Sequence, residues 1–464
     1  MRRTLACLAV VMLSVGAWFL CSTTVNQPLL AAPGTQVFDP GQMGPYAIGH
    51  TSFVLFDSSR PGNREGEATY NGTSRPIPVS LWYPVDRATV KGRPSDAVYP
   101  LDPLSDKAPT TYSDQWEKYG IDPAFEGPVP SIDKPFPLVV FSPGGSEPTW
   151  LNTSTATRLA SHGFVVAVMY HWGNGWWWGW EPWDPAAVAA YNRPRDMSFV
   201  LTDLLARNAA QNDRVLYGLI RPDQVAAAGH SFGGYAAEVL AGGDDSVCDN
   251  VPEEWGEKPA WTCGPSYPDP RFKALALLSG FNDLLHFSEL ARVTVPTIGI
   301  GEEWNTVREQ QARQHAAFSG HPAYRVDLAG AIHMTFSDVC EAAHVLEDIG
   351  WDENGDVAWF LSNCTPDVIP SGLAHQLTHK YMVAFLKTHL AGETGHQSML
   401  TPGWALAREQ YIEFFVTEKR SPNSIDEDWP GLFTYFPHQS GSVQARGEKD
   451  PKVKRPLPGF GAHR

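Results

Sequence analysis

The most specific chemistry in this 464-residue chain lies in one pentapeptide, Gly229-His230-Ser231-Phe232-Gly233. It joins an apolar run that we expect to form a strand, 224–229, to a segment that we expect to form a helix, 231–240. The glycines leave room at a tight turn where side chains would collide with neighbouring backbone. The helix N-terminus behind Ser231 favours developing negative charge. We therefore interpret Ser231 as the nucleophile of an acyl-transfer reaction.

A serine hydroxyl needs a general base to take its proton. Fifteen histidines are available, so their position must select among them. On a sheet of this kind the base follows the last core strand, and His333 stands five residues after Leu328, where we expect that strand to end. We expect His171, at the end of an earlier strand, to line the substrate site. His230 is expected to pack away from the serine.

A tetrahedral intermediate needs two convergent backbone N–H donors for its oxyanion. One is expected at Phe232, the residue after the nucleophile. The other is expected at Gly145, in the loop Ser142-Pro143-Gly144-Gly145 that follows the expected strand 137–141. The same loop residues would also be compatible with a plain turn.

These residues need a scaffold, and the pattern of apolar runs predicts an α/β fold. Strands buried on both faces and alternating with helices are typical of a mostly parallel central sheet, with helices on both faces. We expect strands at 51–56, 77–83, 137–141, 164–170, 224–229, 273–278, 297–300 and 324–328, and helices at 155–162, 195–206, 231–240 and 375–390.

The expected catalytic domain spans residues 44–416 and carries long loop insertions at 85–136 and 172–192. The extension 417–464 is rich in Pro, Lys, Gly and Gln, and we expect part of it to be disordered. With 35 Lys and Arg against 51 Asp and Glu, the net charge of −16 argues against nucleic acid as a partner.

The N-terminal residues 1–32 read as a signal peptide or an N-terminal anchor. Arg2 and Arg3 precede an apolar run from Leu5 to Leu20, which is slightly short for a comfortable membrane span. Cleavage is therefore favoured over anchoring, and the sequence predicts a secreted or periplasmic protein.

Cysteine usage agrees with export. Beyond the targeting segment stand Cys248, Cys263, Cys340 and Cys364, an even set for which we favour the local disulfides Cys248–Cys263 and Cys340–Cys364. No cysteine pair has the spacing of a zinc motif, so a zinc site is not expected. We also expect no other metal and no cofactor.

Six tryptophans crowd into twelve residues after the expected strand 164–170: Trp172, Trp176, Trp177, Trp178, Trp180 and Trp183. Loops at the carboxyl ends of parallel strands surround the active site, so this loop should overhang Ser231. We expect Trp172 and Trp176 to contact substrate, because aromatic walls suit an acyl chain or an aromatic ester. Exposed indoles would also suit a lipid interface, and the alternative is a loop folded on its own aromatics.

Several of these strings together resemble the plasma platelet-activating-factor acetylhydrolases, and they are similar also to the bacterial cutinase and polyester-hydrolase group. The matching pieces are Pro78-Val79-Ser80-Leu81-Trp82-Tyr83-Pro84, Pro137-Leu138-Val139-Val140-Phe141-Ser142-Pro143-Gly144-Gly145, Leu159-Ala160-Ser161-His162-Gly163-Phe164-Val165-Val166, Gly229-His230-Ser231-Phe232-Gly233-Gly234 and Asp269-Pro270-Arg271-Phe272. The resemblance covers about residues 44–390. It implies an α/β-hydrolase fold and a metal-independent serine carboxylesterase, with Ser231 as nucleophile, His333 as base and Gly145 and Phe232 as oxyanion donors.

The chain departs from both groups at the triad acid. The acetylhydrolase position holds Ser279, and the polyesterase position holds Asn305, whose amide cannot stabilise an imidazolium by charge. We expect Glu303, two residues earlier, to serve as the acid, with Asp283 and Glu302 as alternatives. The other reading is that the two glutamates are solvated loop charges.

The sequence thus predicts a secreted serine hydrolase that cleaves short-acyl or phospholipid-type esters through an acyl-enzyme. Its partner would be an ester or lipid-like small molecule. The alternative within enzymes is a cutinase or polyester hydrolase. The missing acid supports a rival from another class, a catalytically silent hydrolase fold that acts as a binding protein.

Overall fold

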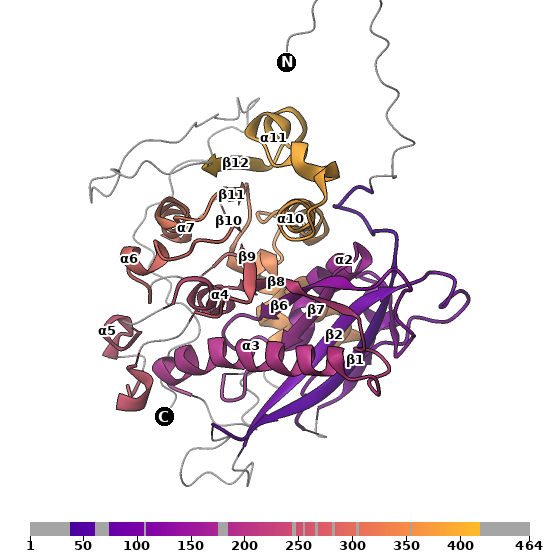
Figure 1. Ribbon diagram of the computed structural model, residues 1–464. Helices are drawn as coiled ribbons and strands as arrows, with labels where there is room; N and C mark the ends of the chain where they lie inside the picture. Colours follow the sequence, from indigo (N-terminus) through magenta and orange to yellow (C-terminus); the bar gives the residue numbers. More distant parts are fainter. Residues whose placement is uncertain are drawn as a thin grey trace, which may run out of the picture. The chain divides into compact units, whose positions relative to one another are not determined.

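The computed structural model describes residues 38–60, 74–105, 108–174, 184–243, 247–253, 256–264, 268–280, 284–302, 306–352 and 355–417. Within them, ten strands form one sheet in the order β12-β11-β10-β9-β8-β6-β7-β2-β1-β5 (Figure 1). The strands from β7 across to β11 are parallel, whereas β12 and β2 pair with them antiparallel. The bounds of the sheet strands are β1 Ala47–Asp57, β2 Arg75–Val85, β5 Ala124–Glu126, β6 Phe136–Ser142, β7 Val165–Met169, β8 Ile220–His230, β9 Phe272–Leu278, β10 Thr297–Glu302, β11 Ala323–Leu328 and β12 Ile412–Thr417.

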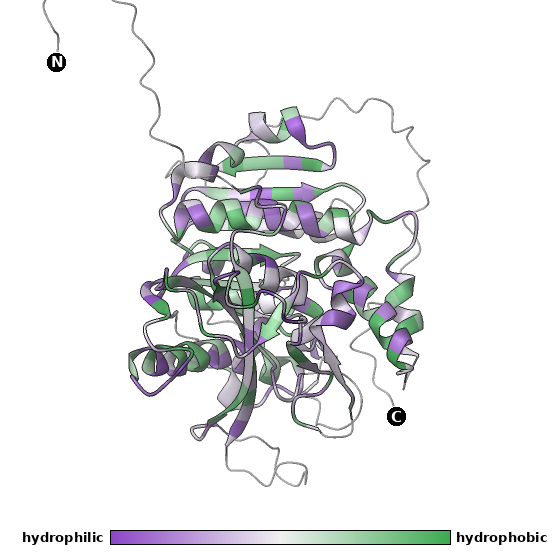
Figure 2. Cartoon of the chain, turned by 90° about the vertical axis from the view of Figure 1, so that its right-hand side faces the viewer, coloured by the Kyte–Doolittle hydropathy of each residue, from purple (hydrophilic) through white to green (hydrophobic). Residues whose placement is uncertain are grey.

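The central strands form because their sequences are apolar on both faces. Every residue of β6 and of β7 is buried, as is typical of parallel strands covered on two sides. Figure 2 shows this contrast, with mainly hydrophobic strands and helices of mixed character. A helix can remain mixed because only one of its faces packs on the sheet.

Helices cover both faces of the sheet, and each face has its own hydrophobic core (Figure 1). One core includes residues of α3 Ala186–Ala209, α4 Phe232–Gly242, α6 Phe287–Leu290 and α7 Thr306–Ala317. The other includes residues of α2 Thr153–Ser161, α8 Val339–Ile349, α9 Asp356–Ser362, α10 Ser371–His389 and α11 Pro402–Arg408. The predicted α/β architecture is confirmed.

Three elements differ from the sequence-based expectations. Strand β12 was not expected, and it closes the sheet edge beside β11. Helix α3 begins inside the stretch that we expected to be an insertion, 172–192. The stretch 85–136 is more structured than an irregular cover, since it holds β3 Val98–Pro100, β4 Thr110–Tyr112, α1 Ser113–Glu117 and β5. Its Trp116 is fully buried, so this insertion packs into the core beside α8.

Both favoured disulfides are confirmed. Cys248 and Cys263 have Cα atoms 5.1 Å apart, and those of Cys340 and Cys364 are 5.8 Å apart. The predicted signal segment 1–32 and residues 418–464 lie outside the described residues. In the part of the chain that is described, no helix is long and apolar enough to cross a membrane.

Candidate active site

Ser231 lies at the sharp turn between β8 and α4, as the pentapeptide predicted. Its backbone has a φ of 52°, a conformation that costs energy for a residue with a side chain. A Cβ on Gly229 would overlap the backbone of Gly233, and a Cβ on Gly233 would overlap the carbonyl oxygen of Ser142. The two glycines are therefore required by close backbone packing, which holds the serine in its strained position.

His333 reaches this serine from the segment after β11. Its Nε2 lies 2.7 Å from the Oγ of Ser231, a hydrogen-bond distance. His333 is the first residue of the 3-10 helix His333–Phe336, and its side chain is 34% exposed. The pair thus has the contact that proton transfer requires, together with access to solvent.

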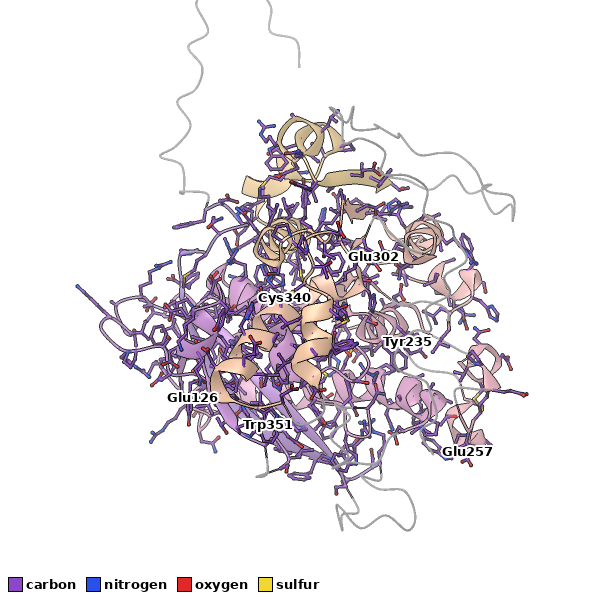
Figure 3. All side chains as sticks on the ribbon, turned by 180° about the vertical axis from the view of Figure 1, so that it is seen from behind. Glu126, Tyr235, Glu257, Glu302, Cys340 and Trp351 are labelled. Atoms are coloured by element: carbon purple, nitrogen blue, oxygen red, sulfur yellow. A yellow bond between two sulfur atoms is a disulfide. The ribbon has the colours of Figure 1, made fainter. Side chains whose placement is uncertain are left out.

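The other ring nitrogen of His333 faces two residues that end adjacent strands. Its Nδ1 lies 2.6 Å from the Oγ of Ser279, directly after β9, and 3.7 Å from Oε1 of Glu302, the last residue of β10. Figure 3 labels Glu302 among the side chains of this region. Neither Glu302 oxygen has a hydrogen bond among the described residues, although the carboxylate is completely buried.

The surroundings of Glu302 keep it ionised. Burial alone would raise its pKa, but the nearby His333 and Ser279 outweigh burial and hold the pKa below its usual value. A buried carboxylate beside Nδ1 suits the stabilisation of an imidazolium. The sequence analysis named Glu302 as an alternative. The favoured Glu303, together with Asp283, lies outside the described residues.

The expected oxyanion residues lie side by side. A Cβ built on Gly145 would be 3.9 Å from the Cβ of Phe232, so the two backbones approach each other next to Ser231. Ser146, the residue after Gly145, has a φ of 64°. Ser146, Ser231 and Ser279 are the described non-glycine residues with positive φ, and all three belong to this site. Such strained conformations cluster at functional sites.

A buried arginine that the sequence analysis missed holds the oxyanion loop. Arg193 of α3 donates hydrogen bonds to the carbonyl oxygens of Pro143 (2.6 Å) and Gly144 (2.7 Å) and to Oδ1 of Asn174 (2.7 Å). Its guanidinium also lies 4.9 Å from the centre of the Phe232 ring. Burial lowers the pKa of Arg193 to about 9, against the charges of Glu147 and Asp196. One cation therefore fixes both halves of the expected oxyanion hole.

An ion pair fixes the same loop from another side. Glu147 accepts the N–H of Gly144 at 2.7 Å and contacts Nδ1 of His230 at 2.8 Å. His230 Nε2 in turn donates to the carbonyl oxygen of His333 at 3.0 Å. Burial opposes both charges, but mutual attraction keeps the pKa of Glu147 low and that of His230 high. His230, which we expected only to pack, therefore links the expected oxyanion loop to His333, and the two imidazole centres lie 4.9 Å apart.

His171 does not line an open site, contrary to our expectation. It is 2% exposed, and both of its nitrogens have protein partners. Nε2 lies 2.8 Å from the Oγ of Ser142, and Nδ1 lies 2.9 Å from Oδ2 of Asp196. Burial first, and then the charge of Arg193, lowers the pKa of His171 to about 4. The residue supports the strand end from which the oxyanion loop begins.

Most of the tryptophans that we expected near the substrate lie outside the described residues. Trp172 is buried, with 4% exposure, but Trp176 and the remaining tryptophans of the cluster lie outside the described residues. The segments 175–183, 281–283 and 303–305 follow β7, β9 and β10. The expected aromatic wall therefore stays a prediction.

Sequence comparisons add little, and a structural comparison identifies the fold. No protein-family model matches the chain, and no curated protein matches it. A solved structure, the ferulic acid esterase from Streptomyces cinnamoneus, is similar to it with a TM-score of 0.51 and 24% sequence identity. The match covers 78% of this chain and 93% of that one. The chain thus has an α/β-hydrolase fold.

Proposed function

We propose that this protein is a serine hydrolase that cleaves carboxylic esters through an acyl-enzyme. The observation that carries the proposal is the 2.7 Å contact between Ser231 Oγ and His333 Nε2, made by a serine at a strained strand-to-helix turn. The name of the structural neighbour, an esterase, supports the same reaction class.

In the acylation step, Ser231 Oγ attacks the ester carbonyl carbon while His333 Nε2 takes the hydroxyl proton. The N–H groups of Gly145 and Phe232 hold the negative oxygen of the intermediate. The bond to the leaving alcohol then breaks, and His333 returns its proton to that alcohol. In deacylation, His333 takes a proton from water, the resulting hydroxide attacks the acyl carbon, and the bond to Ser231 breaks as the proton returns to Oγ.

Glu302 is the proposed third member of the triad, acting beside the hydroxyl of Ser279. The Nδ1–H of His333 donates to Ser279 Oγ, and the carboxylate 3.7 Å from the same nitrogen balances the positive charge of the imidazolium. This arrangement favours an enzyme over a silent binding protein, whose main support was the missing triad acid. The acid is absent from the two positions that the resemblance implied, and a carboxylate one residue beyond Gly301 replaces it.

The preferred substrates are short-acyl or phospholipid-type esters, and a cutinase or polyester hydrolase is the second candidate. The packed insertion between β2 and β6 favours a small-molecule ester over a bulky polymer, because folded chain occupies that part of the surface. The two disulfides support secretion or a periplasmic location, since such bonds persist in oxidising compartments.

A fluorophosphonate probe tests the reaction class. The wild-type protein should be labelled and should hydrolyse p-nitrophenyl esters. Ser231→Ala should not be labelled, and its kcat for ester hydrolysis should fall by about 10⁵-fold or more. A series of acyl-chain lengths, from acetyl upwards, would then define the pocket. An unlabelled, inactive but folded wild-type protein would instead identify the chain as a binding protein.

A further inference from the structure

Apart from the proposed triad, two carboxylates and a histidine lie together on the face of the sheet that α2, α8 and α10 cover. Asp338 precedes α8 as its N-cap residue, Glu341 lies in the first turn of α8, and His375 lies on α10. Figure 3 labels Cys340, which belongs to the same first turn of α8. All three are buried, and one candidate ligand atom from each lies within 4.8 Å of the others. Nε2 of His375 lies 3.7 Å from Oδ1 of Asp338, and Nδ1 of the same ring lies 3.9 Å from Oε1 of Glu341.

We propose that Asp338, Glu341 and His375 form a binding site for a divalent transition-metal ion, with Zn²⁺ as the best fit. One imidazole with two carboxylates is a donor set that zinc accepts, whereas calcium and magnesium take oxygen ligands. Ligands at ordinary zinc distances would be about 3.4 Å apart. One imidazole nitrogen would bind the ion, and the chosen ligand atoms of the three residues lie up to 4.8 Å apart, so the side chains would have to move closer together by about an ångström.

An unsatisfied atom supports the site independently. Oε2 of Glu341 is buried and has no hydrogen-bond partner among the described residues, and neither has Nδ1 of His379. Both residues line a cavity of about 160 Å³, together with Ser154 and His375. A buried carboxylate oxygen without a donor is costly, and a cation with its waters would supply the missing partner.

The remaining surroundings match what metal ligands require. Ser154 donates its backbone N–H to Oδ2 of Asp338 at 2.8 Å, and its hydroxyl donates to Oδ1. Such hydrogen bonds orient a ligating carboxylate. The lone arginine of the cavity lining, Arg158, is paired with Asp122 at 2.6 Å and does not offset the charges of Asp338 and Glu341. Exposed Gly120 also lines the cavity, which gives an entry path from solvent.

The sequence analysis did not predict this site because it looked for paired cysteines. The three residues come from two helices separated by more than thirty positions, and only their packing brings them together. A bound ion would connect α8 to α10 directly and to the start of α2 through Ser154. We expect it to stabilise the fold around the segment that carries His333.

Metal binding is tested on the untagged protein, stripped with a chelator and then dialysed against ZnCl₂ alone. We expect about one equivalent of zinc by mass spectrometry, and a rise in Tm of about 3 °C or more at zinc concentrations near 100 times Kd. CaCl₂ should produce neither effect. Glu341→Gln and His375→Gln should each weaken zinc binding at least about tenfold.

The same helix provides a matched control. His344 and Glu347 form an exposed pair, 3.3 Å apart. Neither residue lines the cavity, although His344 stacks on the ring of Tyr119, which does. His344→Gln with Glu347→Gln therefore removes the same residue types from outside the cavity lining. This control should bind zinc as the wild type does. The proposal is overturned if the stripped wild type takes up no zinc, or if the cavity variants, shown by circular dichroism to be folded, bind it as well as the control. Since esterase activity is not the readout, the result is independent of the proposed function.

Discussion

The described residues contain two serine–histidine–acid chains whose serine–histidine distances are nearly the same, although the acid lies 3.7 Å from the histidine in one and 2.9 Å in the other. In one, Ser231 Oγ lies 2.7 Å from Nε2 of His333, whose Nδ1 faces Glu302. In the other, Ser142 Oγ lies 2.8 Å from Nε2 of His171, whose Nδ1 lies 2.9 Å from Asp196. Judged by these contacts alone, both would qualify as catalytic triads.

Exposure and backbone conformation separate the two chains. Ser231 is partly exposed at a positive φ beside the oxyanion loop, and its histidine is 34% exposed. Ser142 is completely buried at the end of a regular strand. A nucleophile must reach a substrate carbon as well as a base, and only Ser231 can do so.

The two acids also differ in their partners. Asp196 forms a bidentate pair with Arg75, at 2.9 Å for both contacts, and a further pair with Arg60 at 2.7 Å. Burial would raise its pKa, but these two charges hold the pKa of Asp196 far below its usual value. Among the described residues, the ion-pair contact of Glu302 is with His333, at 3.7 Å. The same three residue types therefore form a structural support in one place and a proposed reaction centre in the other.

The largest expected effect tests the two serines directly. Ser231→Ala should lower kcat by about 10⁵-fold or more. Ser142→Ala should retain activity within about tenfold, because it removes only the contacts of one hydroxyl with His171 and Arg193, which support the loop. Peptide mapping after fluorophosphonate labelling should find the adduct on Ser231 alone. Adduct on Ser142, or equal losses in both folded variants, would break the distinction.

The acids should separate rate from stability. Glu302→Gln should lower kcat by about 10³–10⁴-fold with little change in stability, because the charge that balances the imidazolium is lost. Asp196→Asn should instead destabilise the fold by about 3–5 kcal/mol, since it leaves buried arginines uncompensated. Steady-state kinetics and urea denaturation measure the two effects.

A rescue sharpens the assignment of the acid. In the double variant Glu302→Gln with Ser279→Asp, a carboxylate returns beside Nδ1 of His333, at a position where positive φ is tolerated by Asp. The kcat of the double variant should be at least about tenfold higher than that of Glu302→Gln alone. Full activity in Glu302→Gln alone would exclude Glu302, and Glu303 and Asp283 would then be tested in the same way.

The ion pair between Glu147 and His230 should show an intermediate effect. Glu147→Gln weakens the anchoring of Gly144 and of His333 together, so kcat should fall about 10–100-fold while KM changes less. The matched control is His315→Asn, another buried histidine bonded to a backbone carbonyl, that of Ala323 at the far end of β11. That variant should lose stability with unchanged kcat. Equal losses of kcat in both variants would mean that the ion pair contributes only to general packing.

The last expected effect concerns stability alone and is a slope of the unfolding free energy against pH. Burial lowers the pKa of His162, His171 and His315 to about 4, below the ordinary 6.5. As the pH falls through this window the unfolded chain binds protons first, so stability should decrease from pH 6.5 to pH 4. Each histidine contributes about 1.4 kcal/mol per pH unit. His171→Gln should make the slope shallower by about one proton in urea denaturation.

Much of the fold could be read from the sequence because buried parallel strands leave continuous apolar runs. Each of the eight expected strands is present, within a few residues of its bounds. Strand β12 was missed because Glu413 interrupts its apolar pattern. The short elements between β2 and β6 were missed because the pairing of β5 with β1 depends on residues about seventy-five positions away.

The sequence by itself determined the strand-to-helix turn at Ser231, the order in which His333 follows it, and the two local disulfides. Each of these depends on residue types at short spacing or on the order of elements along the chain. Tertiary structure decided what spacing cannot encode: that Glu302 and Ser279 end adjacent strands beside His333, that Arg193 and Glu147 hold the oxyanion loop, and that His171 is buried. Charges and hydrogen bonds act through space, so their partners are known only once the sheet has brought distant strand ends together.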